Sequence, residues 1–524
     1  MRLFTLKSGQ GRVLFAQAGA ALAVAALVGG CADNYRPVVL PIATNGPPAQ
    51  PSSYAVVVSS TGSTTPGVVT IINYSGDAIM TEAPIGPGPT VFTLDEPGST
   101  GLTVNSDGTL SNFGITTTLQ AKNVLESTLP PTAKPVNLTL PAGELLATDL
   151  SSDVVDLFSG SPEAFKLAIP VIGTAANPAT MPMFVAGAPN LTGQREYVLS
   201  QDVPDTAPLV CNVSPRTAPA GALTPIELSS DTADPPIPVG KCPVYAVQTP
   251  DQQRLFVLNR GDDTLSVINT RNNTPDACTP FQNQNGQWIT CHPTIQLPAG
   301  SGPIYAEYNA ATQQLAVANY DGGTMSVVNV SLDEYGNDSN TYTNSNCTTY
   351  AACGPITGGF GTVTTIPVGN TATPNPASVT VLYDGSKAYT ANQNDDSGTG
   401  NGTVTVVNLS TYTVEKTLTV VGHPRTVVNT QNSEYAKIYV ASPDSPQITI
   451  IESSPTVTDL IDTTVLVEGY PIDVRTTTEN GHSGSNNNYS SRVPGYGQPC
   501  NLSPSGMVAA YGANYTLANC RAIP

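Results

Sequence analysis

The sequence predicts an all-β protein, a single β-propeller built from four-stranded blades. Three observations support this fold class: a repeated pattern of short β-runs, abundant turn residues, and an incomplete repeat unit at each end of the repeat region. The 524 residues include 46 Gly and 47 Pro, which suits many turns and few helices. A propeller can use such a length as one closed unit, so the length does not require several domains.

The repeat is clearest in three copies, each of which contains three β-runs divided by turns. The copies span Pro243–Asn269, Pro303–Asn329 and Pro376–Asn408. In each copy an asparagine lies sixteen positions after the proline, namely Asn259, Asn319 and Asn392. A fourth run follows each copy, at Thr294–Leu297, Thr362–Pro367 and Val414–Val420. Four strands in each of several units is the sequence signature of a propeller.

Further units bring the expected number of blades to eight. A fourth good unit begins at Pro424 and is closed by Thr464–Val467. Three weaker units precede the clear copies, with expected strands at Pro89–Leu94, Gly101–Val104, Leu110–Ile115 and Asn123–Thr128; at Val136–Leu140, Leu145–Leu150, Val154–Phe158 and Phe165–Val171; and at Met183–Val185, Glu196–Ser200, Leu209–Asn212 and Pro225–Leu228. Seven blades is the alternative if one weak unit is not a blade.

The remaining blade is expected to combine both ends of the repeat region. Ala55–Ser59 and Val68–Asn73 provide a second and a third run without a first run before them. Pro471–Arg475 provides a first run with nothing after it. Pairing these segments would close the ring and leave no open sheet edge.

The repeated pattern resembles the YVTN family of β-propeller repeats. Tyr389-Thr-Ala-Asn392 and Tyr439-Val-Ala-Ser442 are the nearest copies of the family signature, the second with Ser in place of Asn. The resemblance is strong over residues 240–475 and weak over residues 54–240. It implies a propeller fold in an exported protein of the kind found in surface layers, and the family shades into sugar-lactone hydrolases. A shared fold does not determine an activity.

The first thirty residues resemble the signal peptide of a bacterial lipoprotein. Three basic residues precede an apolar run, Ala18–Val28, which is too short for a permanent membrane span. Gly29-Gly30-Cys31 then resembles the site at which such proteins are cleaved and lipidated, so Cys31 is the expected lipidation site. An ordinary secretory signal with an incidental cysteine is the alternative. Ala32 follows the cysteine instead of an inner-membrane retention aspartate, so we expect an outer-membrane protein facing the periplasm or the cell surface.

We therefore expect four regions along the chain. They are a lipoprotein signal peptide (1–30), a proline-rich flexible tether (31–53), the β-propeller with disulfide-stapled insertions (54–475), and an irregular tail rich in Gly, Ser and Asn (476–524). The main insertions are residues 270–293, 331–360 and 393–401. Loops at equivalent positions of a repeat emerge on one face, where binding commonly occurs.

The charge of the chain excludes some partners. Removal of the signal peptide, with its three basic residues, would leave 17 Lys and Arg against 39 Asp and Glu, a net charge of −22. Such a surface opposes nucleic acid, whose binding depends on Lys and Arg, and opposes adhesion to anionic lipids by charge. We expect a monomer that contacts the membrane through its lipid anchor alone. Its expected partner is an envelope protein or polysaccharide.

The cysteine pattern is typical of an oxidising compartment. Eight of the nine cysteines remain after Cys31 is set aside, and they fall in local pairs, most of them within Pro-, Asn- or Ser-rich insertions. Eight cysteines allow 105 connectivities, so nearest-neighbour pairing is a hypothesis. The expected disulfides are Cys211–Cys242, Cys278–Cys291, Cys347–Cys353 and Cys500–Cys520.

No residue is assigned a catalytic, cofactor-binding or metal-binding role. The three histidines, His292, His423 and His482, share no short motif, and each is interpreted as structural or solvated. Scattered aspartates suggest calcium, but Asp beside Gly is also ordinary turn chemistry; they are Asp149, Asp153, Asp156, Asp262, Asp263, Asp321, Asp395 and Asp396. Trp288, in an insertion, either anchors its loop or stacks on a sugar. The repeat asparagines are expected to bond backbone groups of the adjacent turn.

The sequence is compatible with two functions. The first is a lipid-anchored, exported propeller that binds or scaffolds partners in the cell envelope without catalysis. The alternative is a periplasmic propeller-type lactonase, which needs an arginine or a metal and an acid/base group in one pocket. Arg260 and Arg425 are the candidate arginines.

Overall fold

The structure is a computed structural model, and all residues that it describes belong to the unit formed by residues 51–524. The described residues are 53–95, 98–141, 144–149, 152–173, 181–187, 195–201, 211, 218–249, 251–283, 285–333, 336–396, 398–430, 436–453 and 459–477. The expected signal peptide and nearly all of the expected tether and tail lie outside these ranges.

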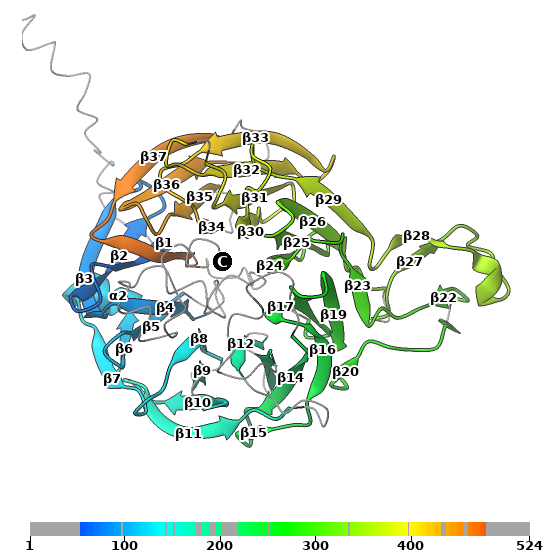
Figure 1. Cartoon of the computed structure of the whole chain (residues 1–524), viewed down its shortest axis with the longest axis horizontal. Coiled ribbons are helices and arrows are strands. Elements are labelled where there is room, and N and C mark those ends of the chain that lie inside the picture. Colours follow the sequence, from blue (N-terminus) through cyan, green and yellow to red (C-terminus); the bar gives the residue numbers. More distant parts are fainter. Residues whose placement is uncertain are drawn as a thin grey trace, which may run out of the picture. The chain divides into compact units, whose positions relative to one another are not determined.

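Eight blades surround a central axis, as the sequence predicts (Figure 1). From the innermost strand outward, blade 1 contains β38 (Tyr470–Thr476), β1 (Tyr54–Ser60), β2 (Pro66–Asn73) and β3 (Ile79–Pro87). Blade 2 contains β4 (Pro89–Leu94), β5 (Thr100–Asn105), β6 (Thr109–Gly114) and β7 (Leu125–Thr128). Blade 3 contains β8 (Pro135–Thr139), β9 (Glu144–Asp149), β10 (Val154–Ser159) and β11 (Ala164–Pro170). Blade 4 contains β12 (Pro182–Gly187), β13 (Arg195–Ser200) and β14 (Ala220–Glu227), whose outer neighbours are β15 (Thr232–Ala233) and β16 (Ile237–Lys241).

The other four blades hold the clear repeats. Blade 5 contains β17 (Pro243–Gln248), β18 (Arg254–Asn259) and β19 (Thr264–Asn269), flanked by β20 (Thr274–Pro275) and β23 (Thr294–Gln296). Blade 6 contains β24 (Pro303–Asn309), β25 (Gln314–Asn319), β26 (Thr324–Asn329) and β29 (Val363–Pro367). Blade 7 contains β30 (Pro376–Val381), β31 (Lys387–Asn392), β32 (Thr403–Asn408) and β33 (Thr413–Thr419). Blade 8 contains β34 (Thr426–Asn429), β35 (Lys437–Ala441), β36 (Gln447–Glu452) and β37 (Leu460–Leu466).

The hydrophobic core lies between neighbouring blades. The first three strands of a blade are covered on both faces, so they consist largely of Val, Ile, Leu, Ala and Thr and are buried along almost their whole length. One core cluster, for example, joins Val57 of blade 1 to Tyr439 and Ile450 of blade 8. The outermost strands, such as β33 and β37, are exposed at most positions and carry charged residues, which discourages pairing with another chain.

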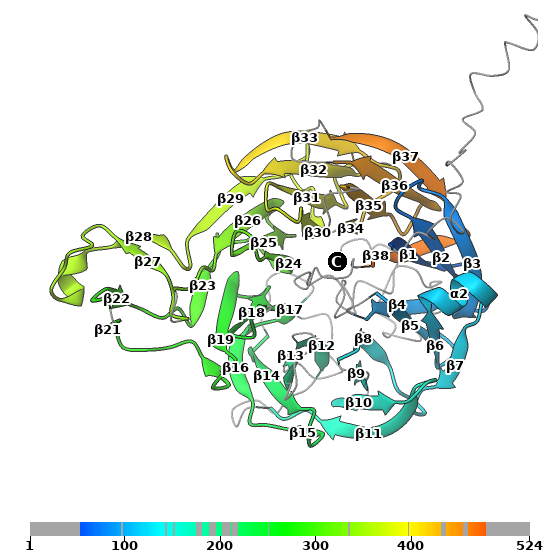
Figure 2. The ribbon, with the colours of Figure 1, turned by 180° about the vertical axis from the view of Figure 1, so that it is seen from behind.

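The ring is closed by strands from both ends of the repeat region, which confirms the predicted closure. β1 and β38 pair antiparallel, with Val56 opposite Arg475 and Val57 opposite Val474. The innermost strands contact one another in an unbroken circle of β38, β4, β8, β12, β17, β24, β30 and β34. Both views show β38 beside β1 and facing β4 (Figures 1 and 2).

The structure corrects the predicted strands of blade 4. Pro225–Leu228, expected as the fourth strand, lies mainly in the third strand, β14, which pairs with β13. The segment Leu209–Asn212, expected as the third strand, is not part of it, and only Cys211 is among the described residues. Between Ser200 and Ala220 the chain makes a long connection, so the true third strand begins later than the even repeat spacing suggests.

Two other elements were not anticipated. The helix α2 (Ile115–Ala121) lies between the third and fourth strands of blade 2, where the strand was expected to continue to Ile115. Its Ile115 and Thr118 are buried, and Lys122 ends the helix in the left-handed conformation. β3 supplies the fourth strand of blade 1, for which no segment had been identified.

The repeat asparagines have a structural role, with partners that differ from the expected ones. In blade 7, Nδ2 of Asn392 donates to the hydroxyls of Thr403 and Thr405, at 3.0 and 2.8 Å. Asn259 and Asn319 make the corresponding bonds to a Thr and a Ser of the third strand. Asn105 in blade 2 makes them too. The amide therefore ties the ends of the second and third strands through side chains, where bonds to turn backbone were expected.

Candidate functional site

Two insertions project together beyond the rim of blades 5 and 6. Residues 270–293 connect β19 to β23, and residues 331–360 connect β26 to β29. The first insertion forms the small hairpin of β21 (Phe281–Gln282) and β22 (Trp288–Ile289); the second forms that of β27 (Asn340–Tyr342) and β28 (Ile356–Gly359). Figures 1 and 2 show both hairpins on one extension of the ring. We call residues 270–293 and 331–360 the protrusion.

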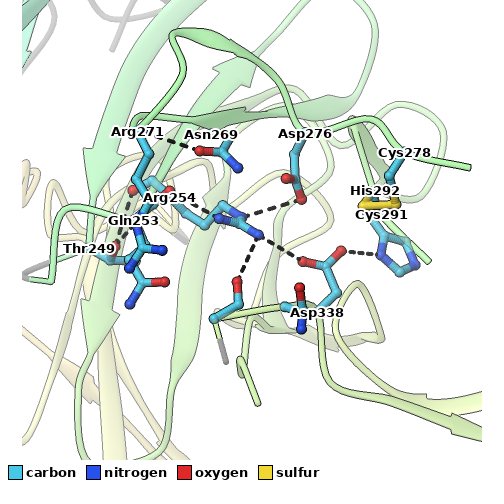
Figure 3. A network of polar contacts seen from close by, with 12 residues as sticks. Thr249, Gln253, Arg254, Asn269, Arg271, Asp276, Cys278, Cys291, His292 and Asp338 are labelled. Atoms are coloured by element: carbon cyan, nitrogen blue, oxygen red, sulfur yellow. Dashed lines mark hydrogen bonds and ion pairs between the residues drawn. A yellow bond between two sulfur atoms is a disulfide. The ribbon is translucent and has the colours of Figure 1, made fainter. Parts of the chain in front are cut away.

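A buried ionic network joins the two insertions at their base (Figure 3). Nδ1 of His292, in the first insertion, lies 2.7 Å from Oδ2 of Asp338, in the second. Oδ1 of Asp338 lies 3.5 Å from Nη2 of Arg254, which comes from β18. Nε of Arg254 lies 3.3 Å from Oδ2 of Asp276, close enough for an ion pair although the N–H does not point at the oxygen. The Asp338 side chain has 0% exposure, so both insertions are tied to blade 5 beneath the surface.

Acidic groups outnumber the arginine in this network. Burial and the negative charge of Asp338 raise the pKa of Asp276 to about 6, whereas Arg254 acts in the opposite direction. Asp276 therefore carries its full charge only above this pH. The network holds two acids and one arginine, with a histidine at its edge, and all of its contacts are made within the fold.

The bridge at Asp338 belongs to a repeated arrangement between neighbouring blades. The basic residue that opens the second strand of one blade pairs with an aspartate between the third and fourth strands of the next blade. In blade 7, Nζ of Lys387 lies 2.6 Å from Oδ2 of Asp459. In blade 8, Lys437 pairs with Asp77 of blade 1. Arg254 and Asp338 occupy the same places in blades 5 and 6, so the protrusion is attached through a tie that the fold already uses.

Disulfides hold the insertions as well. Cys278–Cys291 closes the base of the first hairpin, and Cys347–Cys353 closes a short segment of the second insertion. Cys211–Cys242 links the long connection in blade 4 to the start of blade 5. These are three of the four expected pairs. Cys500 and Cys520 lie outside the described residues, and their bond stays a prediction.

The outer part of the protrusion carries aromatic side chains from both insertions. The rings of Trp288 and Tyr350 lie 6.1 Å apart, and those of Tyr342 and Tyr350 lie 6.2 Å apart, nearly perpendicular. Tyr350 opens the short helix η1 (Tyr350–Cys353) and is 38% exposed, as is Phe281 on β21. Nδ2 of Asn340 donates to Oγ1 of Thr290 at 3.0 Å, a direct bond between the two hairpins.

A groove of about 510 Å³ lies beside the base of the protrusion. It runs between β16 of blade 4 and β19 of blade 5, and both ends of the first insertion border it. Its lining mixes proline rings with hydroxyls and includes Pro238, Thr264, Ser266, Pro275 and Pro293.

The third insertion, residues 393–401, is not part of the protrusion. It connects the second and third strands of blade 7, and Asp395 accepts hydrogen bonds from the backbone N–H groups of Asn370 and Thr371. Asp396 accepts from the N–H groups of residues 398, 399 and 400. Asp149, Asp153, Asp262 and Asp263 accept backbone N–H bonds from residues 15 to 39 positions away in the sequence. Turn chemistry therefore accounts for Asp396, whereas Asp395 and these four aspartates hold distant backbone segments. Asp156 is buried, and its burial and the charge of Asp149 raise its pKa to about 6.

The two candidate arginines of the lactonase alternative are both buried. Arg260 forms a two-point pair with Asp321, with Nη2 2.8 Å from Oδ1 and Nε 3.1 Å from Oδ2. The guanidinium of Arg260 also lies 5.3 Å from the ring centre of Tyr320. The positive charge of Arg425 acts on the same tyrosine. Burial raises the pKa of Tyr320 to about 12, so its phenol is neutral at pH 7. The guanidinium of Arg260 is thus already paired with the carboxylate of Asp321.

The histidines have separate partners. His292 contacts Asp338 as described, and its ring lies 5.4 Å from that of Phe360. His423, in the loop that leads into blade 8, bonds Asp444 through Nδ1. His482 lies outside the described residues, as does Cys31. In the part of the chain that the structure describes, no group of three or more His, Cys, Asp or Glu is placed to hold a metal ion. No helix there has the length and apolar character of a membrane span.

Comparison with known proteins supports the fold and goes no further. No protein-family model matches the chain, and no curated protein matches it in sequence. Among solved structures, the dihydro-heme d1 dehydrogenase NirN is similar over 81% of this chain and 75% of its own, at 12% identity and a TM-score of 0.52. AztD from Citrobacter koseri is similar over 82% of this chain and 98% of its own, at 12% identity and a TM-score of 0.49. A candidate 6-phosphogluconolactonase from Bacteroides fragilis is similar over 82% of this chain and 99% of its own, at 14% identity and a TM-score of 0.47.

The structure neighbours and the blades define this chain as a β-propeller protein. The sequence had not indicated Arg254, Asp276 or Asp338 as site residues. A signal was nevertheless present, because Arg254, Lys387 and Lys437 each open a second strand, and a buried charge at a repeated position needs a partner.

Proposed function

We propose that this protein is an exported, non-catalytic binding protein of the cell envelope, held to the outer membrane by a lipid on Cys31. The protrusion is the element that it presents to its partner. One observation carries the proposal: two long insertions from different blades are joined through Asp338 into one body beyond the rim. The resemblance to YVTN repeats, which occur in exported proteins, is consistent with this role.

The disulfides support an oxidising, extracytoplasmic environment. The lipid anchor rests on the sequence around Cys31, and the outer-membrane location rests on Ala32 after it. Metabolic labelling with a fatty acid tests the anchor directly. We expect label on the wild-type protein and none on Cys31→Ser, which should leave the membrane fraction; equal labelling of both forms would exclude this lipidation site.

The construction of the protrusion favours binding over simple loop variation. Long connections in compact domains are uncommon and are usually functional or disordered. These two connections are ordered by a buried ion pair, two disulfides and a bond between the hairpins. Ordering a loop before its partner arrives lowers the entropy lost on binding, which raises affinity.

The decisive experiment compares two soluble proteins that lack Cys31. One is residues 34–524; the other is the same chain with 277–291 and 340–359 each replaced by a short Gly-Ser turn. The replacements remove the cysteines in bonded pairs and keep Arg254 and Asp338. Both proteins are incubated with envelope extract, and retained components are identified.

We expect a component that the intact protein retains and the shortened protein does not, with equal thermal unfolding of the two. Identical retention profiles would show that the protrusion is not the binding element. Turnover of sugar lactones by purified residues 34–524 would contradict the non-catalytic role and favour a propeller-type lactonase.

A further inference from the structure

The aromatic surface of the protrusion carries no formal charge. Residues 277–291 and 339–362 contain no Asp, Glu, Lys or Arg, in a protein whose net charge is −19. The polar side chains there are amides and hydroxyls, such as Gln282, Asn283, Gln287 and Asn344. This surface can donate and accept hydrogen bonds, but it offers no charge to a ligand.

From this surface we propose that Trp288, Tyr342 and Tyr350 form a binding platform for a neutral glycan. The inference rests on the proposed function and names the class of partner. Aromatic rings bind the C–H faces of sugars through their apolar surface, and the surrounding amides and hydroxyls match sugar hydroxyl groups. A neutral glycan meets no electrostatic repulsion when it approaches the uncharged part of an acidic protein. An anionic polysaccharide, in contrast, is repelled by the rest of the surface.

The rings are held in place before any ligand binds. A two-stranded hairpin is marginally stable by itself, and both hairpins here have strands of two to four residues. Cys278–Cys291 closes the hairpin that carries Trp288, and Cys347–Cys353 brackets Tyr350. The bond from Asn340 to Thr290 fixes the two hairpins relative to each other. A preorganised aromatic surface loses less conformational entropy on binding than a mobile one.

The exposure of Tyr350 argues against a purely internal role for the ring cluster, in which Trp288 and Tyr342 are half-buried. Tyr350, which contacts both other rings, is 38% exposed, and Phe281 on the paired strand is exposed to the same degree. A protein partner is less well matched, because the binding cores of protein interfaces are enriched in Arg as well as in aromatic residues, and this surface has no Arg.

Trp288 is the only tryptophan in the chain, so intrinsic fluorescence reports on this surface alone. The soluble protein, residues 34–524, is titrated with hexasaccharides of β-linked glucose, of β-linked N-acetylglucosamine and of α-linked mannose, and with an oligogalacturonate as the anionic comparison. Retention on insoluble cellulose and chitin, both neutral, is measured in parallel. We expect a saturable change in tryptophan emission with at least one neutral glycan and none with the oligogalacturonate.

Three variants separate stacking from folding. Tyr350→Ala should weaken binding about tenfold, whereas Tyr350→Phe, which keeps the ring, should bind within about threefold of wild type. Tyr412→Ala, which removes a comparably exposed tyrosine from blade 7, should bind like wild type. Peptide mapping of Cys347–Cys353 in Tyr350→Ala confirms that the segment is still closed.

The outcomes distinguish this inference from the broader proposal. No emission change and no retention with any neutral glycan overturns the platform, as does binding that Tyr350→Ala leaves intact. If the protrusion still retains an envelope protein in that case, the binding role stands and the glycan assignment fails. If the intact and shortened proteins retain the same components and no glycan binds, both proposals fail.

Discussion

Asp338 and His292 lie 46 positions apart on insertions of different blades, and yet Oδ2 of the first lies 2.7 Å from Nδ1 of the second. The same carboxylate faces Arg254 through its other oxygen. One buried side chain therefore connects both halves of the protrusion to the ring. Its removal should loosen the protrusion first and the blades later.

We predict that Asp338→Asn lowers the free energy of opening of the protrusion by about 1–3 kcal/mol, because the side chain loses its charged contacts with His292 and Arg254 while Asp276 still faces Arg254. Hydrogen exchange of residues 280–290 and 340–358 measures this local stability. The matched control is Asp231→Asn, which removes one ion pair of the exposed Lys166 and should have a much smaller effect, because exposed pairs are screened by solvent. Equal, small effects of the two changes would mean that Asp338 does not hold the protrusion.

The repeat asparagines should contribute similarly to stability in each blade that has one. Asn392→Ala removes the donor to Thr403 and Thr405 in a fully buried place and should lower the free energy of unfolding by about 1–3 kcal/mol. Asn105→Ala in blade 2 should cost a similar amount. Asn346→Ala, at an exposed position, should stay within about 0.5 kcal/mol of wild type. Urea unfolding followed by circular dichroism provides the comparison, and a neutral Asn392→Ala would contradict the assigned role.

Glu196 should make the folding stability of the protein decrease as pH rises. Burial in β13, against Gly187, raises the pKa of this carboxyl from 4.5 to about 8. Between these values the folded chain holds a proton that the unfolded chain has released, so this group's contribution to stability falls as pH rises through that window. Each unit of pKa shift corresponds to about 1.4 kcal/mol.

We therefore expect Glu196→Gln to gain stability relative to wild type as pH rises from about 5 to about 8, by several kcal/mol. Glu126→Gln, at an exposed place on β7, should show no such trend. Urea unfolding at a series of pH values measures the difference. A constant difference between Glu196→Gln and wild type across this range would show that Glu196 is not buried as described.

Closure of the ring should depend on β38 far more than on the residues that follow it. Deleting 470–477 leaves β1 without its inner neighbour and exposes Ala55 and Val57, so we expect loss of the cooperative thermal transition and aggregation. Ending the chain after residue 483, which removes Cys500 and Cys520 together, should shift the transition much less. Static light scattering with a thermal melt compares the two, and similar melts would contradict the closure.

Much of the fold could be predicted because each blade repeats a local pattern. The spacing from Pro243 to Asn259 recurs in three blades. The unpaired strand edges at the two ends of the repeat region are removed when these two segments pair with each other. Blade 4 was partly wrong because a long connection breaks the regular spacing before Ala220. The helix α2 was missed because its sequence, Ile-Thr-Thr-Thr-Leu, has β-branched residues that favour strands.

The site could be predicted only in part. The two insertions and their cysteine pairs were visible in the sequence, whereas the meeting of the insertions was not. Arg254 and Asp338 are 84 positions apart, and their contact depends on the angle between blades 5 and 6. The assembly of Trp288, Tyr342 and Tyr350 depends on that same angle, since the rings come from different blades.

The pairing of β1 with β38 also sets the order of events when the chain is made. The backbone N–H of Tyr54 bonds Oγ1 of Thr477, which is synthesised 423 residues later. A ribosome or a translocation channel delivers the N-terminal strand first, and that strand waits with an open edge until nearly the whole propeller has emerged. Completion of the ring is thus a post-translational event, and any factor that shields an exposed strand edge would act on the first blade throughout this interval.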